Sequence, residues 1–134
     1  MTNLHPQQSH PSPSILLVED ELVIRMNAAD YLIDRGFLVL EASNATEALA
    51  YLTSCVVEID LVFTDVRMPG KMDGLALARW LQQHRAGLPV IVTSGDVGRD
   101  NLSDKTFPAD CFFPKPYELC KIAETIAKLT QPAA

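Results

Sequence analysis

Short apolar runs alternate with segments of helical periodicity along this chain, and that alternation restricts its possible folds more than any other feature. The runs cover residues 15–18, 37–42, 59–64, 90–93 and 111–113. They are mainly apolar throughout, which is typical of strands that helices cover on both faces. Because strands separated by helices need crossover connections, the sequence predicts a parallel sheet between two layers of helices.

Two helices are expected between the first three runs. Apolar residues recur at helical spacing over about 21–35, and Gly36 stands where a helix commonly ends. The second helix is expected at about 44–54, because Asn44 followed three residues later by Glu47 resembles a capping box.

Two further helices are expected after the third and fifth runs, and the stretch between the fourth and fifth runs is less regular. Asp73 can cap a helix that ends before Gly87. The final helix is expected to carry an apolar face and to have Pro116 in its first turn. Over 97–108, Leu102 is the only strong apolar anchor at helical spacing, so a fourth helix there should be short or irregular.

Length and composition favour one domain with two short tails. A chain of 134 residues with 48% hydrophobic content can bury a single core. Residues 1–13 contain three prolines and few apolar side chains, which predicts a disordered N-terminal tail. The domain should therefore cover 14–130, with 131–134 as a C-terminal tail.

Charge and hydropathy exclude two classes of partner. No apolar run approaches the roughly 18 residues of a transmembrane helix, and the N-terminus lacks the basic and apolar regions of a signal peptide. We therefore expect a cytoplasmic protein with no membrane partner. A formal net charge of -6, without a cluster of lysine and arginine, argues against a nucleic-acid partner.

Polar side chains follow four of the five predicted strands. These are Glu19 and Asp20 after the first, Asp65 after the third, Ser94 after the fourth and Lys115 after the fifth. An isolated aspartate at a strand end is normally a turn or cap residue. The carboxyl ends of parallel strands, however, meet at one edge of a sheet, where such folds bind ligands. The sequence therefore predicts that these residues converge on one site.

The predicted site suits a hard divalent cation and a phosphoryl group. Mg²⁺ prefers oxygen ligands, so Asp20 and Asp65 are expected to bind it, with Glu19 as a direct or water-mediated ligand. A carboxylate such as that of Asp65 can attack a phosphoryl donor, while Lys115 neutralises the phosphoryl oxygens. The hydroxyl that donates to them comes from Ser94 or Thr93, since strand alternation lets only one of the two face the site.

The chain resembles the receiver domains of bacterial two-component response regulators over about residues 14–130. The resemblance rests on Leu-Val-Glu-Asp-Glu at 17–21, Thr-Asp-Val-Arg-Met-Pro-Gly at 64–70, Val-Ile-Val-Thr-Ser-Gly at 90–95 and Pro-Lys-Pro-Tyr at 114–117. It implies a flavodoxin-like fold of three α/β/α layers, with strand order 2-1-3-4-5. It also implies that Asp65 is the phospho-acceptor of a His-to-Asp phosphorelay.

The resemblance further implies how the site is loaded and read. A sensor histidine kinase or a His-phosphotransfer domain would donate to Asp65 with Mg²⁺, for which Mn²⁺ could substitute, and the backbone carbonyl of Arg67 would be a further metal ligand. Ser94 would then move towards the phosphoryl group and Phe112 would turn inward. The surface of the fourth helix, fifth strand and fifth helix would signal to an unknown downstream protein, as a monomer or a phosphorylation-dependent homodimer.

Two positions beside the site are expected to affect the phospho-aspartate, and one insertion departs from the family pattern. Arg67 and Asp96 lie two residues after Asp65 and Ser94, so we expect them to tune the lifetime of the phospho-aspartate. Hydrolysis rates of their alanine variants would reveal such an effect. Lys71 lengthens the loop after the Met-Pro-Gly turn by one residue relative to the common form of the family.

Three functional hypotheses remain open from the sequence. The first is a stand-alone receiver that catalyses only its own phosphorylation and dephosphorylation and is otherwise not an enzyme. The second is a small Mg²⁺-dependent phosphatase with an aspartate nucleophile. Such enzymes commonly place a second aspartate where this chain has Arg67, which disfavours that hypothesis. The third is the receiver portion of a hybrid histidine kinase or of a longer regulator.

Overall fold

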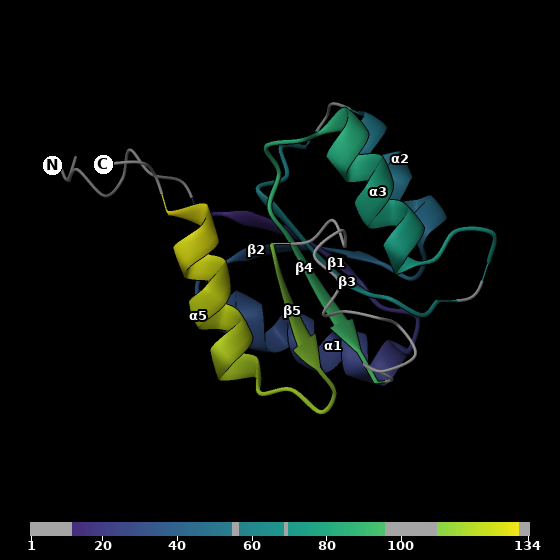
Figure 1. Ribbon diagram of the computed structural model, residues 1–134. Helices are drawn as coiled ribbons and strands as arrows, with labels where there is room; N and C mark the ends of the chain where they lie inside the picture. The colour runs from purple at the N-terminus through teal and green to yellow at the C-terminus, as the bar shows by residue number, and fades with distance from the viewer. Residues whose placement is uncertain (1–11, 55–56, 69, 96–109, 132–134) are drawn as a thin grey trace, which may run out of the picture.

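The computed structural model describes residues 12–54, 57–68, 70–95 and 110–131, and these form a parallel sheet between two layers of helices (Figure 1). The sheet has five strands in the order β2-β1-β3-β4-β5. The strands are β1 (Ser14–Val18), β2 (Leu38–Ala42), β3 (Leu61–Asp65), β4 (Val90–Ser94) and β5 (Cys111–Pro114). The described helices are α1 (Leu22–Asp34), α2 (Ala45–Ser54), α3 (Gly74–His84) and α5 (Leu119–Thr130). The predicted flavodoxin-like arrangement is confirmed.

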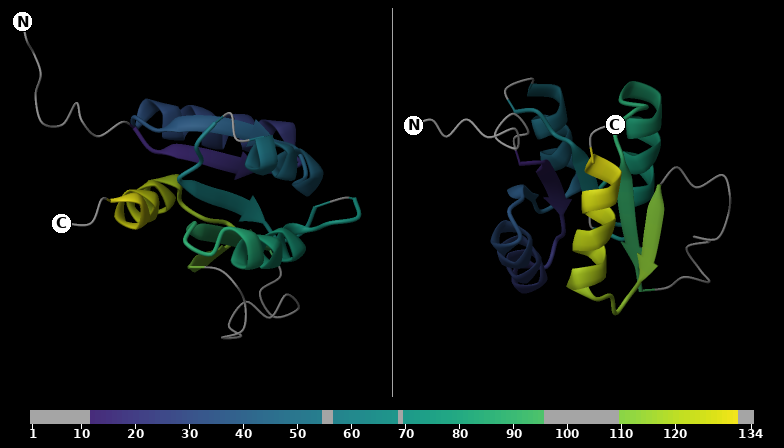
Figure 2. Two further views of the ribbon diagram at one scale, coloured as in Figure 1. Left: turned by 90° about the horizontal axis from the view of Figure 1, so that it is seen from above. Right: turned by 90° about the vertical axis from the view of Figure 1, so that its left-hand side faces the viewer.

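Each face of the sheet has its own apolar core. Helices α1 and α5 pack on one face and α2 and α3 on the other (Figure 1, Figure 2). Alternate residues of β1 and β3 divide between the two cores: Leu17 and Phe63 belong to the α1 and α5 side, and Leu16 and Val62 to the α2 and α3 side. Burial on both faces explains why these strands are mainly apolar throughout. No helix within the described ranges has the length and hydropathy needed to cross a bilayer.

Side-chain caps fix the starts of two helices as the sequence predicted. The Asn44 side chain accepts a hydrogen bond from the Glu47 N–H (2.8 Å), and the Glu47 carboxylate accepts from the Ser43 N–H (2.7 Å). The bonds from Ser43 lower the pKa of Glu47, which keeps this capping carboxylate ionised. At α3, Asp73 Oδ1 accepts from the Ala76 N–H (2.9 Å).

The expected start of the final helix was wrong. Helix α5 begins at Leu119, after an extended N-cap residue, Glu118, so Pro116 lies before the helix. The peptide bond between Lys115 and Pro116 is cis. The next residue, Tyr117, packs edge-to-face on Phe63 of β3 with ring centroids 5.8 Å apart. Residues 115–118 are therefore a loop held against the sheet. Of the expected N-terminal tail (1–13), residues 1–11 lie outside the described residues, and so does the expected fourth helix (97–108).

The strand register brings the carboxyl ends of the central strands to one edge. Val18 pairs with Thr64, Asp65 with Thr93, and Ser94 with Pro114. The loops that leave β1, β3 and β5 therefore begin at the same edge of the sheet, although they are far apart in the sequence. This edge carries the residues that the sequence singled out.

Candidate functional site

Three carboxylates meet at this edge. Each of Glu19, Asp20 and Asp65 places one carboxylate oxygen so that all three oxygens lie within 4.8 Å of one another. Glu19 and Asp65 are only 4% and 7% exposed, whereas Asp20 is exposed. Such a set of oxygen donors at the mouth of a partly buried site has the chemistry that Mg²⁺ favours. The predicted convergence of these acids is observed.

Lys115 approaches the carboxylates from the β5 side. Its Nζ donates a hydrogen bond to Asp65 Oδ2 (2.5 Å) and lies 3.8 Å from Glu19 Oε1. Burial acts to lower the pKa of Lys115, but the hydrogen bond to Asp65 and the neighbouring negative charges outweigh it, so the pKa is raised. The ammonium therefore stays charged at neutral pH and is the counter-ion of Asp65.

Glu19 is the most enclosed acid of the site. Burial raises its pKa, and this outweighs the hydrogen bond from the Glu21 N–H to Glu19 Oε2 (3.0 Å) and the charge of Lys115. A nearby cation favours the ionised form of such a buried carboxyl group. A cation bound among these acids would therefore act against the effect of burial on the pKa of Glu19.

The loop after Asp65 is held by a very close backbone approach. A Cβ atom added to Gly74 would lie 1.8 Å from the Asp65 carbonyl oxygen and 2.9 Å from Val66 Cα. The Gly74 N–H donates to the Val66 carbonyl (2.8 Å), and the Arg67 N–H donates to Asp65 Oδ1 (3.3 Å). Sequence reasoning missed the role of Gly74. The sequence did contain a signal for this role: a glycine directly follows the cap residue Asp73, at a helix position where a side chain is ordinarily tolerated.

The chain matches the family model described as the response regulator receiver domain over residues 15–127. It belongs to that family. This receiver is 36% identical over 123 residues to the sensor kinase CckA of Brucella abortus, an alignment that covers 90% of the chain and 13% of the kinase. The chain also spans less than half the length of two transcriptional regulators of Pseudomonas aeruginosa to which it is similar.

Solved structures with the same fold include receivers from two signalling contexts. The receiver domain from the hybrid histidine kinase CckA superposes with a TM-score of 0.72 at 36% identity, covering 88% of this chain and 99% of that one. The response regulator TrrA of Thermotoga maritima, in complex with Mg(2+)-BeF, superposes with a TM-score of 0.76 at 29% identity, covering 87% and 98%.

The other expected site residues of this receiver are placed in part. Ser94 and Thr93 are both buried, and the Ser94 carbonyl accepts from the Lys115 N–H (2.8 Å), which holds the ends of β4 and β5 together. Phe112 is 36% exposed on β5. The roles expected for Ser94 and Phe112 stay predictions, and Asp96 lies outside the described residues.

Proposed function

We propose that this receiver accepts a phosphoryl group on Asp65 from a phosphohistidine donor and thereby signals to another protein. One observation carries the proposal: the buried Asp65 carboxylate lies between two further acids and the Lys115 ammonium. A carboxylate oxygen of Asp65 would attack phosphorus as the bond from phosphorus to the donor's imidazole nitrogen breaks, so the imidazole leaves.

The acidic cluster fits Mg²⁺ as the cofactor of this transfer. Glu19, Asp20 and Asp65 would supply side-chain oxygens, and the backbone carbonyl of Arg67 a further ligand. The bound ion would supply positive charge to the phosphoryl oxygens in the transition state. The similarity to TrrA, which was crystallised with Mg(2+)-BeF, supports this proposal. Mn²⁺, which accepts the same oxygen ligands, is a possible substitute.

Two residues of the chain would act on the phosphoryl group itself. Lys115, charged and already paired with Asp65, would pair with a phosphoryl oxygen, and the Ser94 hydroxyl would donate a hydrogen bond to another. Hydrolysis by water would return Asp65 to its free form. Arg67 and Asp96, two residues beyond Asp65 and Ser94, would tune how long the phosphoryl group persists. The switch would bias the surface of the fourth helix, β5 and α5, including Phe112.

The deciding experiment is phosphorylation by a small donor. Incubation with acetyl phosphate and Mg²⁺ should add the mass of one phosphoryl group to the parent protein, and none to Asp65→Asn. Asp30→Asn, which changes an exposed aspartate on α1, is the matched control and should be labelled like the parent. An unlabelled parent over a range of donors would contradict the proposal. Turnover of a phosphomonoester well beyond one equivalent would instead favour the phosphatase hypothesis.

We infer that the phosphohistidine donor docks beside α1, because an apolar groove there leads to the site. The groove, of about 510 Å³, is lined by α1, Gly95, residues 115–117 and the first residue of α5, Leu119. Outside the groove lining, three apolar side chains near the start of α1 are exposed to solvent: Leu22, Val23 and Met26, at 56%, 69% and 49%. An exposed apolar surface of this kind fits the apolar face of a helical donor domain.

Replacing Val23 by aspartate separates docking from chemistry. The added charge should lower the rate of transfer from a phosphorylated histidine donor domain by about 10-fold or more, the effect of losing roughly 1.4 kcal/mol of contact. Labelling by acetyl phosphate, which needs no docking surface, should match the parent. Ile33→Asp, at an exposed position near the other end of α1, is the control. Equal transfer to Val23→Asp and to the parent would place the docking surface elsewhere.

A second candidate function is the receiver portion of a longer hybrid kinase. The similarity to the sensor kinase CckA and to the receiver domain from the hybrid histidine kinase CckA favours it. In that case the phosphoryl donor would be part of the same protein or of a phosphotransfer partner. Whether the reading frame continues into kinase domains distinguishes this candidate from a stand-alone receiver.

A further inference from the structure

Arg25 of α1 links the site to strand β2, and neither the family motifs nor the expected site residues include it. Its guanidinium donates a hydrogen bond from a terminal nitrogen to the Glu19 backbone carbonyl (2.8 Å). Its Nε donates to Glu41 Oε1 (3.1 Å). The Arg25 side chain is 15% exposed and that of Glu41 is 41% exposed. Arg25 therefore bridges α1, the loop after β1 and the edge strand β2.

The carbonyl that Arg25 binds belongs to the peptide unit between Glu19 and Asp20, two of the three clustered acids. Holding that peptide plane restricts rotation about ψ of Glu19 and φ of Asp20, the torsions that set where the two side chains lie relative to it. Two unit negative charges about 4 Å apart repel by roughly 4 kcal/mol at an effective dielectric near 20, and the Lys115 ammonium opposes this repulsion mainly at Asp65, to which it donates. Repulsion of this size would spread the acids apart if their backbone were free to rotate. The charged hydrogen bond from Arg25 opposes that movement.

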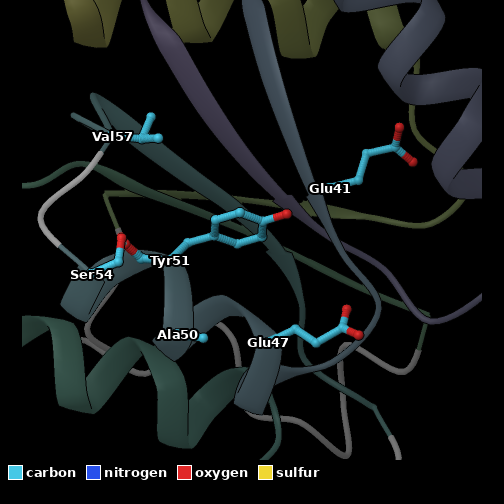
Figure 3. A pocket seen from close by; sticks show the side chains of 6 residues that line it. All are labelled: Glu41, Glu47, Ala50, Tyr51, Ser54 and Val57. Carbon is cyan, nitrogen blue, oxygen red and sulfur yellow. The ribbon is translucent and has the colours of Figure 1, made fainter.

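Arg25 also carries a positive charge near the acids, which by itself would weaken the binding of a cation. Glu41 neutralises most of that charge, since the two groups form an ion pair at 3.1 Å. Figure 3 places Glu41 and Glu47 together at one end of an open hollow, with Ser54 and Val57 at the other end. The charge of Arg25 also contributes to lowering the pKa of Glu47. The guanidinium thus has two negative groups on its β2 side, and these offset its charge.

We propose that Arg25 is a positioning residue that holds the Glu19–Asp20 peptide in the orientation needed to bind Mg²⁺. The proposal rests on the proposed function, because it assumes that these acids hold the ion. Residues that orient metal ligands in this way typically contribute 10–100-fold to metal affinity. Lysine cannot replace the guanidinium fully, because one ammonium lacks the planar fork that reaches both the Glu19 carbonyl and Glu41.

The test measures Mg²⁺ affinity directly, by calorimetric titration of the unphosphorylated protein. Arg25→Met should weaken Mg²⁺ binding by about 10-fold, and Arg25→Lys by an intermediate factor. The Mg²⁺ concentration for half-maximal labelling by acetyl phosphate should rise by the same factor. The labelling rate at saturating Mg²⁺ should change by less than about 3-fold, because Arg25 touches neither the phosphoryl group nor Asp65. Raising the ionic strength should leave the ratio between variant and parent unchanged, since positioning is not screened by salt.

Two outcomes would overturn the proposal while leaving the proposed function intact. One is a parent that binds Mg²⁺ and an Arg25→Met variant that binds it equally well or more tightly. The other is an Arg25→Lys variant identical to the parent, which would assign the effect to charge alone. If Arg25→Met does not fold, Glu41→Gln replaces it in the test. This variant keeps the bond from Arg25 to the Glu19 carbonyl, so its Mg²⁺ affinity should fall by less than about 3-fold. A parent that does not bind Mg²⁺ at all would instead contradict the proposed function.

Discussion

Replacing Gly74 by alanine is expected to destabilise the domain by about 3 kcal/mol or more, among the largest effects of a single methyl group. The added Cβ would lie 1.8 Å from the Asp65 carbonyl oxygen and 2.7 Å from the Asp65 carbonyl carbon. Both are backbone atoms, so no side chain can rotate away to make room. In an unhindered helix the same change would stabilise by roughly 0.5–1 kcal/mol, so the clash decides the sign.

The same substitution should also remove function in whatever fraction folds. Relief of the clash requires either α3 or the end of β3 to move, and the end of β3 carries the Asp65 side chain. We therefore expect loss of labelling by acetyl phosphate together with a lower free energy of unfolding in urea. Gly87→Ala is the matched control, because nothing lies within 4 Å of the position of its Cβ, and its stability should stay within about 0.5 kcal/mol of the parent. A Gly74→Ala variant as stable as the parent would show that the loop yields easily.

Gly74 and Arg25 illustrate what sequence reasoning could not reach. The alternation of apolar runs and helical periods predicted the parallel sheet and the edge where Asp65 meets Glu19 and Asp20. The family resemblance predicted the strand order. Those predictions depend on periodicity and on the rule that parallel strands end together. The contact of Gly74 with the Asp65 backbone, and that of Arg25 with the Glu19 carbonyl, depend instead on the exact path of loops.

Pro116 shows the opposite failure, in which a local rule was applied correctly and the surroundings overrode it. Proline suits the first turn of a helix, and an apolar helical stripe follows it in the sequence. The structure delays the start of α5 to Leu119 because Tyr117 packs on Phe63 and Lys115 reaches Asp65. The contacts of Lys115 and Tyr117 thus determine the conformation of residues 115–118, and the helix begins only after them.

Replacing Lys115 by methionine is expected to change Mg²⁺ binding and phosphorylation in opposite directions. In the unphosphorylated protein the ammonium donates to Asp65 Oδ2 at 2.5 Å, so it competes with a metal ion for the same carboxylate. Its pKa is raised above the ordinary 10.5, so the competition persists throughout the neutral range and ends only when the pH rises through the raised value. Removing it leaves the three carboxylates without the cation that pairs with Asp65 and Glu19, and Mg²⁺ should then bind more tightly.

Phosphorylation should nevertheless become slower, by about 10²–10³-fold, the usual cost of losing one donor to a developing oxyanion. Without a metal the variant should also be less stable than the parent, by about 1–3 kcal/mol, because Asp65 and Glu19 stay buried without their counter-ion. Saturating Mg²⁺ should restore most of that stability. Calorimetric titration, urea unfolding with and without Mg²⁺, and labelling by acetyl phosphate measure the three effects, with Lys121→Met on the exposed side of α5 as the control.

Lys115→Met is expected to raise Mg²⁺ affinity and to lower the labelling rate, so it is more informative than a variant that only loses activity. A Lys115→Met protein that loses both Mg²⁺ binding and labelling would indicate that the ammonium supports the site structurally, by holding the acids together. A protein that binds Mg²⁺ more tightly but is labelled at the parent rate would mean that another group neutralises the phosphoryl oxygens. Only tighter binding with slower labelling fits an ammonium that pairs with Asp65 before transfer and with the phosphoryl group during it. The 2.5 Å bond seen here would then be the resting half of that exchange.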